Sequence, residues 1–186
     1  IPPLLTGNEP RDGGFLSNLD ISEAETIRAK DLTAAKYLRQ IIGSDELLNG
    51  PGKRFCLWLT DAKPSDIASS KILKERVAQV RENRLKAVGT KSAKARTADT
   101  PALFSRIAQP KTRYMAVPSV SSEKRAYIPI AFFEKEVIVN NAIFFIESED
   151  LSLFAILQSR PFTIWVQNVS SRLESRYQIS ASAVYN

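Results

Sequence analysis

Three short apolar runs in the second half of the chain constrain its fold more strongly than any other feature. They cover residues 114–117, 127–133 and 142–146, and polar turns separate them. Short apolar runs bounded by turn signals are typical of strands that are at least partly buried on both faces of a sheet. The pattern therefore predicts a sheet in this half of the chain.

The first half of the chain shows helical spacing in two places. Ser22 and Glu25 have the spacing of a capping box, which predicts a helix start. Apolar residues then recur at intervals of three and four, at Leu32, Ala35, Leu38 and Ile42. Because glycine commonly ends a helix, a second helix is predicted to run up to Gly43.

Turn residues and a proline mark the next elements. Asn-Gly and Pro-Gly pairs precede a predicted strand over residues 55–59. Pro64 then opens a predicted helix of roughly residues 66–87. Its inward stripe consists of Leu73, Val77 and Val80.

Two more helices are predicted near the C-terminal end. Asp150 can cap one over residues 151–157, and Pro161 can open another that turns Trp165 and Val169 inward. Helices and strands thus mix without a βαβ rhythm or an internal repeat. With 186 residues and 44% hydrophobic content, the chain suits one substantial core. We predict an α+β fold over residues 1–186: a single mixed domain with a partly antiparallel sheet and several flanking helices.

Composition excludes several kinds of active site. The chain has no histidine, which removes Ser-His-Asp and Cys-His catalysis and the usual imidazole metal ligands. Cys56 is the only cysteine, so an internal disulfide and a multi-cysteine zinc site are excluded and a reducing compartment is indicated. Cys56 also lies in an apolar run, which favours an inert buried thiol. The carboxylates at 147, 149 and 150 are interpreted as a loop or helix cap, and no metal site is predicted.

The ends and the hydropathy of the chain give two further expectations. Ile1-Pro2-Pro3 lacks the features of a signal sequence, and the chain is interpreted as a piece of a longer protein. No apolar run approaches the roughly 18 residues of a membrane-spanning helix, so no membrane association is expected.

Positive charge is concentrated in one segment. The net charge is +6, and residues 71–96 alone hold nine basic and two acidic residues. A polyanionic partner is one interpretation, and a solvated helix with a basic loop is the other. The segment's candidate contacts to a DNA backbone are Lys71, Lys74, Arg81 and Arg84.

The stretch SRLESRYQIS, residues 171–180, alternates in character. Read as one extended segment, it places planar polar heads on one side, namely Glu174, Arg176 and Gln178. Apolar side chains lie on the other side, namely Leu173, Tyr177 and Ile179. The segment is therefore predicted to expose a row of hydrogen-bonding groups above an apolar face.

This polar row matches the chemistry of a base pair. In the major groove cytosine offers an amino donor and its paired guanine offers two acceptors, so Glu174 and Arg176 together can read one C·G pair. Gln178 adds an amide, which suits bidentate contact with adenine. The alternative is a surface salt bridge between Glu174 and Arg176, worth under about 1 kcal/mol.

Several dispersed segments carry a resemblance to a known family. They are IGSDELLNG (42–50), RFCLWL (54–59), VPSVSSEKRAYIP (117–129), RLESRYQIS (172–180) and VYN (184–186). In this order they resemble the target-recognition domain of MmeI-like restriction-modification enzymes, of type IIL or IIG. The resemblance implies a parent protein with a nuclease, a helical connector and an adenine-N6 methyltransferase that uses S-adenosylmethionine.

The resemblance also implies roles for individual residues. Side chains spaced as Glu174 and Arg176 set the base pair next to the methylated adenine, with Glu/Arg accompanying C and Lys/Asp accompanying G. Ala142 and Gln178 are implicated jointly in the preceding base pair, although Gln178 replaces an arginine found in some relatives. The implied target ends in adenine then cytosine, with the adenine methylated.

A second block implies contacts to the DNA backbone. Its residues are Ser121, Ser122, Lys124 and Arg125, in a VSSERR-like segment. Hydroxyls and cations in a turn suit phosphate oxygens, and a purely structural hairpin is the alternative.

The chain itself is predicted not to be an enzyme. Its only Pro-Pro pair follows Ile1, so it lacks the Asn/Asp-Pro-Pro-Tyr/Phe motif of an adenine methyltransferase, and no nuclease constellation is evident. No catalytic residue and no cofactor are assigned to it; S-adenosylmethionine and Mg²⁺ are expected in the parent enzyme. The expected partners are double-stranded DNA and the methyltransferase domain of the same polypeptide, in a bacterial cytoplasm. A basic protein-docking or scaffold domain and a small carboxylate enzyme remain the alternatives.

Overall fold

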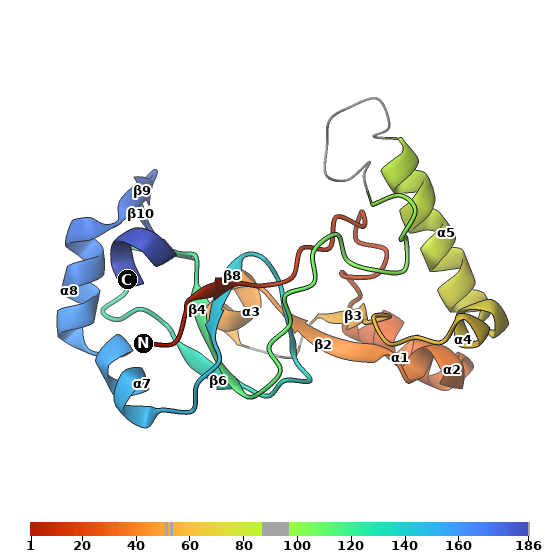
Figure 1. Cartoon of the computed structure of the whole chain (residues 1–186), viewed down its shortest axis with the longest axis horizontal. Helices are drawn as coiled ribbons and strands as arrows, with labels where there is room; N and C mark the ends of the chain where they lie inside the picture. Colours follow the sequence, from red (N-terminus) through yellow and green to blue (C-terminus); the bar gives the residue numbers. More distant parts are fainter. Residues whose placement is uncertain (51, 53, 87–96, 186) are drawn as a thin grey trace. The chain divides into compact units, whose positions relative to one another are not determined.

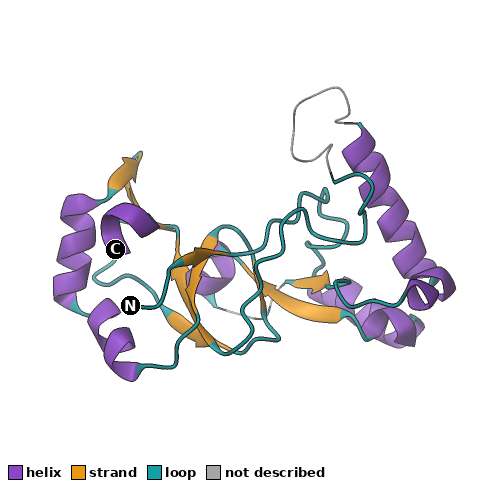
Figure 2. Cartoon of the chain, viewed as in Figure 1, coloured by secondary structure: helices purple, strands orange, loops and turns teal. Residues whose placement is uncertain are grey.

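The computed structural model describes residues 1–50, 52, 54–86 and 97–185 (Figure 1). They fall into two compact units. The first comprises Ile1–Gly7, Ile42–Pro51 and Ala108–Asn186, and the second comprises Asn8–Ile41 and Gly52–Ile107. Both contain helices and strands (Figure 2), which confirms the mixed α+β class.

The first unit is built on a four-stranded antiparallel sheet. Its order is β1 (Leu5–Thr6), β8 (Ile143–Ile146), β4 (Tyr114–Pro118) and β6 (Ala131–Phe133). Two of the predicted apolar runs thus form the central strands, and the run at 127–133 contributes only its last residues.

Side chains of β4 alternate between two cores. Met115 and Val117 belong to one apolar cluster, whereas Tyr114 and Ala116 belong to the other. The first cluster also includes Tyr177, which comes from the stretch 171–180. This stretch is therefore anchored in a core of the first unit.

Helices α7 (Leu151–Leu157) and α8 (Arg160–Val169) follow the sheet. Asp150 caps α7 and a proline opens α8, as predicted. The prediction that Trp165 points inward is wrong: Trp165 is 51% exposed, and the neighbouring Val166 is buried instead. The unit is completed by α3 (Ser44–Asn49), β7 (Ile138–Val139) and a π-helix, η1 (Ala181–Tyr185).

The second unit corrects the predicted helix up to Gly43. Helix α2 (Leu32–Ala35) is short, and strand β2 (Leu38–Ile42) follows it. β2 pairs antiparallel with β3 (Phe55–Leu57), the strand predicted at this position. Because β2 has buried residues on both faces, the spacing of its apolar residues also fits a helix. This is why a helix was predicted here. Gly43 instead precedes α3 as its N-cap.

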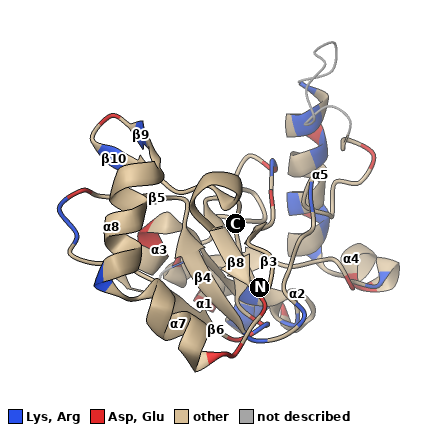
Figure 3. Cartoon of the chain, turned by 60° about the vertical axis from the view of Figure 1, so that its left-hand side comes forward, with Lys and Arg blue, Asp and Glu red and all other residues tan. Residues whose placement is uncertain are grey.

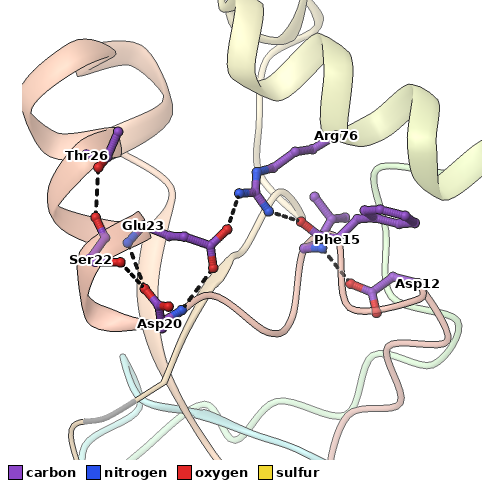
Figure 4. Close-up of polar contacts among 8 residues, drawn as sticks. Asp12, Phe15, Asp20, Ser22, Glu23, Thr26 and Arg76 are labelled. Carbon is purple, nitrogen blue, oxygen red and sulfur yellow. Dashed lines mark hydrogen bonds and ion pairs between the residues drawn. The ribbon is translucent and has the colours of Figure 1, made fainter.

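Helix α1 (Ile21–Lys30) has its capping box at Asp20 and Glu23, two residues before the predicted Ser22 and Glu25. The Asp20 carboxylate accepts from the Glu23 backbone N–H at 2.8 Å, and the Glu23 carboxylate accepts from the Asp20 N–H at 3.2 Å. Arg76 then donates to Glu23 at 2.9 Å and to the Phe15 carbonyl at 2.7 Å (Figure 4). The cap therefore also holds α1 to the helix that carries Arg76.

The helix predicted at 66–87 is two helices, α4 (Pro64–Ser69) and α5 (Lys71–Leu85). Ser70 separates them as the N-cap of α5, with its Oγ accepting from the Leu73 N–H at 3.0 Å. The same Oγ donates to Asp31 Oδ2 at 2.6 Å. Asp31 is itself the N-cap of α2, so one carboxylate stabilises two helix starts.

Asp31 gives the second unit a predictable response to acid. Partial burial raises the pKa of Asp31, but hydrogen bonds from Ser70 and the Ala34 N–H outweigh it and hold the pKa below its ordinary value. A carboxyl with a lowered pKa stabilises the fold above its unfolded pKa of about 3.9, and this contribution is lost as pH falls through the folded pKa.

The stability advantage of the wild type over Asp31→Asn is therefore expected to be constant from neutral pH to about pH 5 and to shrink below about pH 4. Urea unfolding of both proteins across this range measures it. Asp45→Asn, at an exposed position of α3, is the control for general acid effects. An advantage of Asp31 that stays constant down to pH 2 would contradict the assignment.

Candidate nucleic-acid interface

The stretch 171–180 forms a hairpin rather than one extended segment. Strands β9 (Ser171–Leu173) and β10 (Arg176–Gln178) pair antiparallel with Leu173 opposite Arg176, so Glu174 and Ser175 form the turn. β10 also pairs with β5 (Val120–Ser121), and the order of this sheet is β5-β10-β9. Glu174 therefore lies at the tip of a hairpin, with a φ of 57°.

The predicted alternation holds only for β10 and the residue after it. Tyr177 is 7% exposed and Ile179 is 2% exposed, and both pack into the core of the first unit. Arg176 and Gln178 lie exposed on the opposite face. Leu173 was predicted to be inward but is 47% exposed, because the chain reverses after it. The core thus fixes β10 and directs two of the three predicted polar heads into solvent.

Glu174 and Arg176 form an ion pair across the turn. Arg176 Nη2 lies 3.0 Å from Glu174 Oε2, and the side chains are 49% and 79% exposed. The predicted alternative of a surface salt bridge is therefore present. One such bond occupies only one of the five N–H groups of a guanidinium and one oxygen of a carboxylate, so both groups retain capacity to bind a further partner.

Ser119 links Ala142 to Ile179, the residue that follows Gln178. The Ala142 carbonyl accepts from Ser119 Oγ at 2.8 Å. The Ser119 carbonyl accepts from the N–H of Ile179, the residue after Gln178, at 2.9 Å. Ser171 Oγ donates to Gln178 Oε1 at 3.3 Å. Ser119, which sequence reasoning missed, thus connects Ala142 to the backbone beside Gln178, and the joint role of Ala142 and Gln178 stays a prediction.

The turn after β5 contains the residues predicted to contact phosphate. Ser121 departs from this prediction because it is 1% exposed, so its hydroxyl lies inside the unit. Ser122 Oγ accepts from the Lys124 N–H at 3.2 Å, and the Ser122 carbonyl accepts from the Arg125 N–H at 3.2 Å. Lys124 is exposed and Arg125 is half-buried. Three of the four predicted residues therefore lie on an accessible turn.

Arg84 corrects the prediction for the basic helix. It is completely buried, and its guanidinium donates to five backbone carbonyls. They are the carbonyls of Pro10, Arg11, Thr97, Thr100 and Leu103. Burial lowers its pKa, and the nearby Asp12 carboxylate opposes this effect. Arg84 is a structural residue of the second unit and is not available to a phosphate.

The other three predicted backbone contacts lie on α5 and are exposed, whereas Arg76 of the same helix is engaged by Glu23 and the Phe15 carbonyl. Lys71, Lys74 and Arg81 are exposed, and the ribbon of this helix carries several blue Lys and Arg positions in Figure 3. Lys71 lies 3.8 Å from Glu75 in an exposed pair. Lys86 pairs with Glu82 at 3.0 Å, and the basic residues of the predicted segment at 91, 94 and 96 lie outside the described residues.

The cysteine and two of the clustered carboxylates considered in the sequence have structural surroundings. Cys56 is buried, and burial raises the pKa of its thiol. Asp150 caps α7, and Glu147 accepts from the Lys111 N–H, so both take structural roles. Within residues 1–50, 54–86 and 97–185, no cluster of three Cys, Asp or Glu side chains is arranged to hold a metal ion.

Fold and site together define a binding domain that presents a polar hairpin from a mixed α+β core. The sequence model of the family "MmeI, target recognition domain" matches residues 1–186, and the chain belongs to this family. The resemblance found in the sequence is thereby confirmed.

Two relatives support this assignment. The chain is 37% identical over 186 residues to DNA methyltransferase A of Bacillus subtilis (strain 168), covering 100% of this chain and 21% of that protein. It is similar to the type IIL restriction-modification enzyme MmeI, solved in complex with DNA, with a TM-score of 0.93 and 38% identity. That match covers all of this chain and 24% of MmeI. The chain thus spans about a quarter or less of these relatives. Among the described helices, none is long and apolar enough to cross a membrane.

Proposed function

We propose that this chain recognises a sequence in double-stranded DNA by reading base edges in the major groove. The observation that carries the proposal is the exposed Glu174–Arg176 pair at a hairpin tip whose second strand is anchored by buried Tyr177. Preorganised polar groups on a rigid element suit base readout, because little side-chain freedom is lost on binding. The DNA complex of MmeI supports duplex DNA as the partner.

Each polar group has a base-pair partner. The Glu174 carboxylate accepts from the cytosine amino group, and the Arg176 guanidinium donates to the two acceptors of the paired guanine. Gln178, together with Ala142, is assigned to the preceding base pair, where an amide suits adenine. The proposed target ends in adenine then cytosine.

Basic residues in each unit are proposed to contact the duplex backbone. We assign phosphate contact to Ser122, Lys124 and Arg125 in the first unit, because this turn follows the strand that pairs with β10. In the second unit the exposed residues Lys71, Lys74 and Arg81 supply further positive charge. Phosphate contacts position a protein on DNA and make its binding salt-dependent.

Both units act as one target-recognition domain over residues 1–186 in this proposal. The domain selects the adenine that a methyltransferase domain of the same polypeptide extrudes from the duplex and methylates at N6. The parent enzyme uses S-adenosylmethionine for methylation and Mg²⁺ for cleavage, in a bacterial cytoplasm. The chain contributes positioning and no catalytic group.

Selection from a duplex pool tests the proposal. The chain is incubated with duplexes that carry degenerate sites, and bound sequences are counted at several salt concentrations. We expect enrichment of C at one fixed position after A, with a cost of about 1–3 kcal/mol for the wrong pair, and affinity that falls linearly with salt on logarithmic axes.

Gln178→Ala is the matched control on the same strand, expected to relax the preceding pair and to keep the preference for C. Salt-sensitive binding without sequence preference would contradict base readout by this chain. An absence of binding at low salt would favour the alternative of a protein-docking domain.

A further inference from the structure

We infer that Arg172 is a positioning residue that holds the reading hairpin in its binding geometry, an inference that rests on the proposed function. Arg172 lies in β9 opposite Tyr177 of β10. Facing residues of an antiparallel pair project to the same side, so Arg172 shares the face of buried Tyr177. Arg176 and Gln178 project to the other face, and Arg172 therefore supports the readers from behind.

The guanidinium of Arg172 contacts β10, the turn and the segment that follows β5. Its carbon lies 4.8 Å from the centre of the Tyr177 ring in β10. Its Nη1 lies 3.4 Å from the Ser175 carbonyl in the turn and 3.9 Å from Glu123 Oε2, just after β5. One side chain thus joins β9, the turn, β10 and the segment that follows β5 (Figure 3 shows charged residues at this hairpin).

The hairpin needs such a contact because β9 has no buried residue. A two-stranded hairpin without apolar burial is marginally stable, and β9 is the edge strand of its sheet. The turn also contains Glu174 at a φ of 57°, which a residue other than glycine adopts only when its surroundings impose it. The bond from Arg172 to the Ser175 carbonyl acts directly beside this residue.

A planar guanidinium is required for this combination. It stacks on the Tyr177 ring while its N–H groups reach two oxygen acceptors, whereas an ammonium is a compact point charge that does not stack in this way. Lysine therefore keeps the charge of Arg172 but not its set of contacts. The substitution Arg172→Lys consequently separates positioning from simple attraction to phosphate.

The test compares the wild type, Arg172→Lys and Arg172→Met on two duplexes that differ only in C·G or G·C at the position assigned to Glu174 and Arg176. The wild type is expected to discriminate by about 5- to 150-fold. Both variants are expected to fall below about threefold, with the salt slope of Arg172→Lys unchanged. Lys124→Met is the matched control, expected to lower the slope by about 1 and to keep the discrimination.

Two results would overturn the inference. One is wild-type discrimination by Arg172→Lys. The other is an equal loss of affinity for both duplexes in Arg172→Met together with a reduced salt slope, which would make Arg172 a phosphate contact.

Amide hydrogen exchange in the free chain separates this inference from the proposed function. Exchange at Arg176 and Gln178 is expected to be about tenfold faster in both variants than in the wild type, because the hairpin opens locally. If the wild type fails to discriminate between bases, the proposed function fails, and the exchange rates still decide whether Arg172 holds the hairpin. Unchanged exchange in both variants would overturn the inference.

Discussion

Arg84→Met is expected to lower the free energy of unfolding by at least about 3 kcal/mol. Arg84 is completely buried and donates to five carbonyls, at distances between 2.7 and 3.2 Å. Methionine fills part of the space but donates no hydrogen bond, so buried carbonyls are left unsatisfied. These carbonyls belong to segments 10–11 and 97–103, whose loops are held to α5 by this side chain.

Urea denaturation of the chain measures this loss. Arg81→Met is the matched control, since Arg81 is exposed on the same helix and its loss is expected to change stability by no more than about 0.5 kcal/mol. Arg84→Lys is expected to fall between the two, because an ammonium has three donors in place of five. Equal stability of the Arg84 and Arg81 variants would contradict the structural role of Arg84.

The contrast between Arg84 and Arg81 shows which property of a residue the sequence did not predict, namely burial. The helical spacing of apolar residues predicted that Leu73 and Val80 are buried, and the structure confirms this. The helical spacing did not indicate that Arg84 is buried. The carbonyls that accept its hydrogen bonds come from segments that are remote in the sequence. A basic residue in a charged helix was therefore predicted to contact phosphate.

Elements with local signals were predicted well. Asp150 caps α7 at the expected residue, and two of the apolar runs form the central strands of the main sheet. Strand β2 was predicted as a helix because its buried residues Leu38, Ile41 and Ile42 have a spacing that fits both structures. The segment forms a strand because it pairs with β3. The spacing of apolar residues along the segment carries no information about this pairing.

The sequence indicated the candidate residues of the site but not the hairpin that carries them. Two-residue hairpin turns commonly contain glycine or asparagine, and the Glu174–Ser175 turn contains neither. The hairpin was consequently read as one strand, and Arg172 was missed. Once the turn is known, the five-residue separation of Arg172 and Tyr177 identifies them as facing residues.

Exchange of the two reading groups is expected to change the preferred base pair from C·G to G·C. In the variant Glu174→Lys/Arg176→Asp, the donor and the acceptor trade places across the turn. A lysine donates to guanine and an aspartate accepts from the cytosine amino group, so the complementary pair is preferred in the reverse orientation. The free energy of binding is expected to weaken by about 1–3 kcal/mol for the C·G site and to improve by a similar amount for the G·C site.

The hairpin is expected to tolerate this exchange. Glu174 already occupies a left-handed backbone conformation with a side chain other than glycine, so lysine adds no new class of strain. Opposite charges remain two residues apart, which keeps an exposed ion pair of the kind seen at 3.0 Å. The net charge is also unchanged, and so nonspecific attraction to phosphate is expected to be equal in the two proteins.

Pool selection with both proteins at one salt concentration measures the exchange. Arg176→Met alone is the control, expected to lose discrimination at this pair without acquiring a preference for G. Continued preference for C by the double variant would remove Glu174 and Arg176 as readers, and the source of specificity would then lie elsewhere in the chain. A switch confined to this one position would instead mean that donor and acceptor placement at the hairpin tip determines the base, independently of the overall charge.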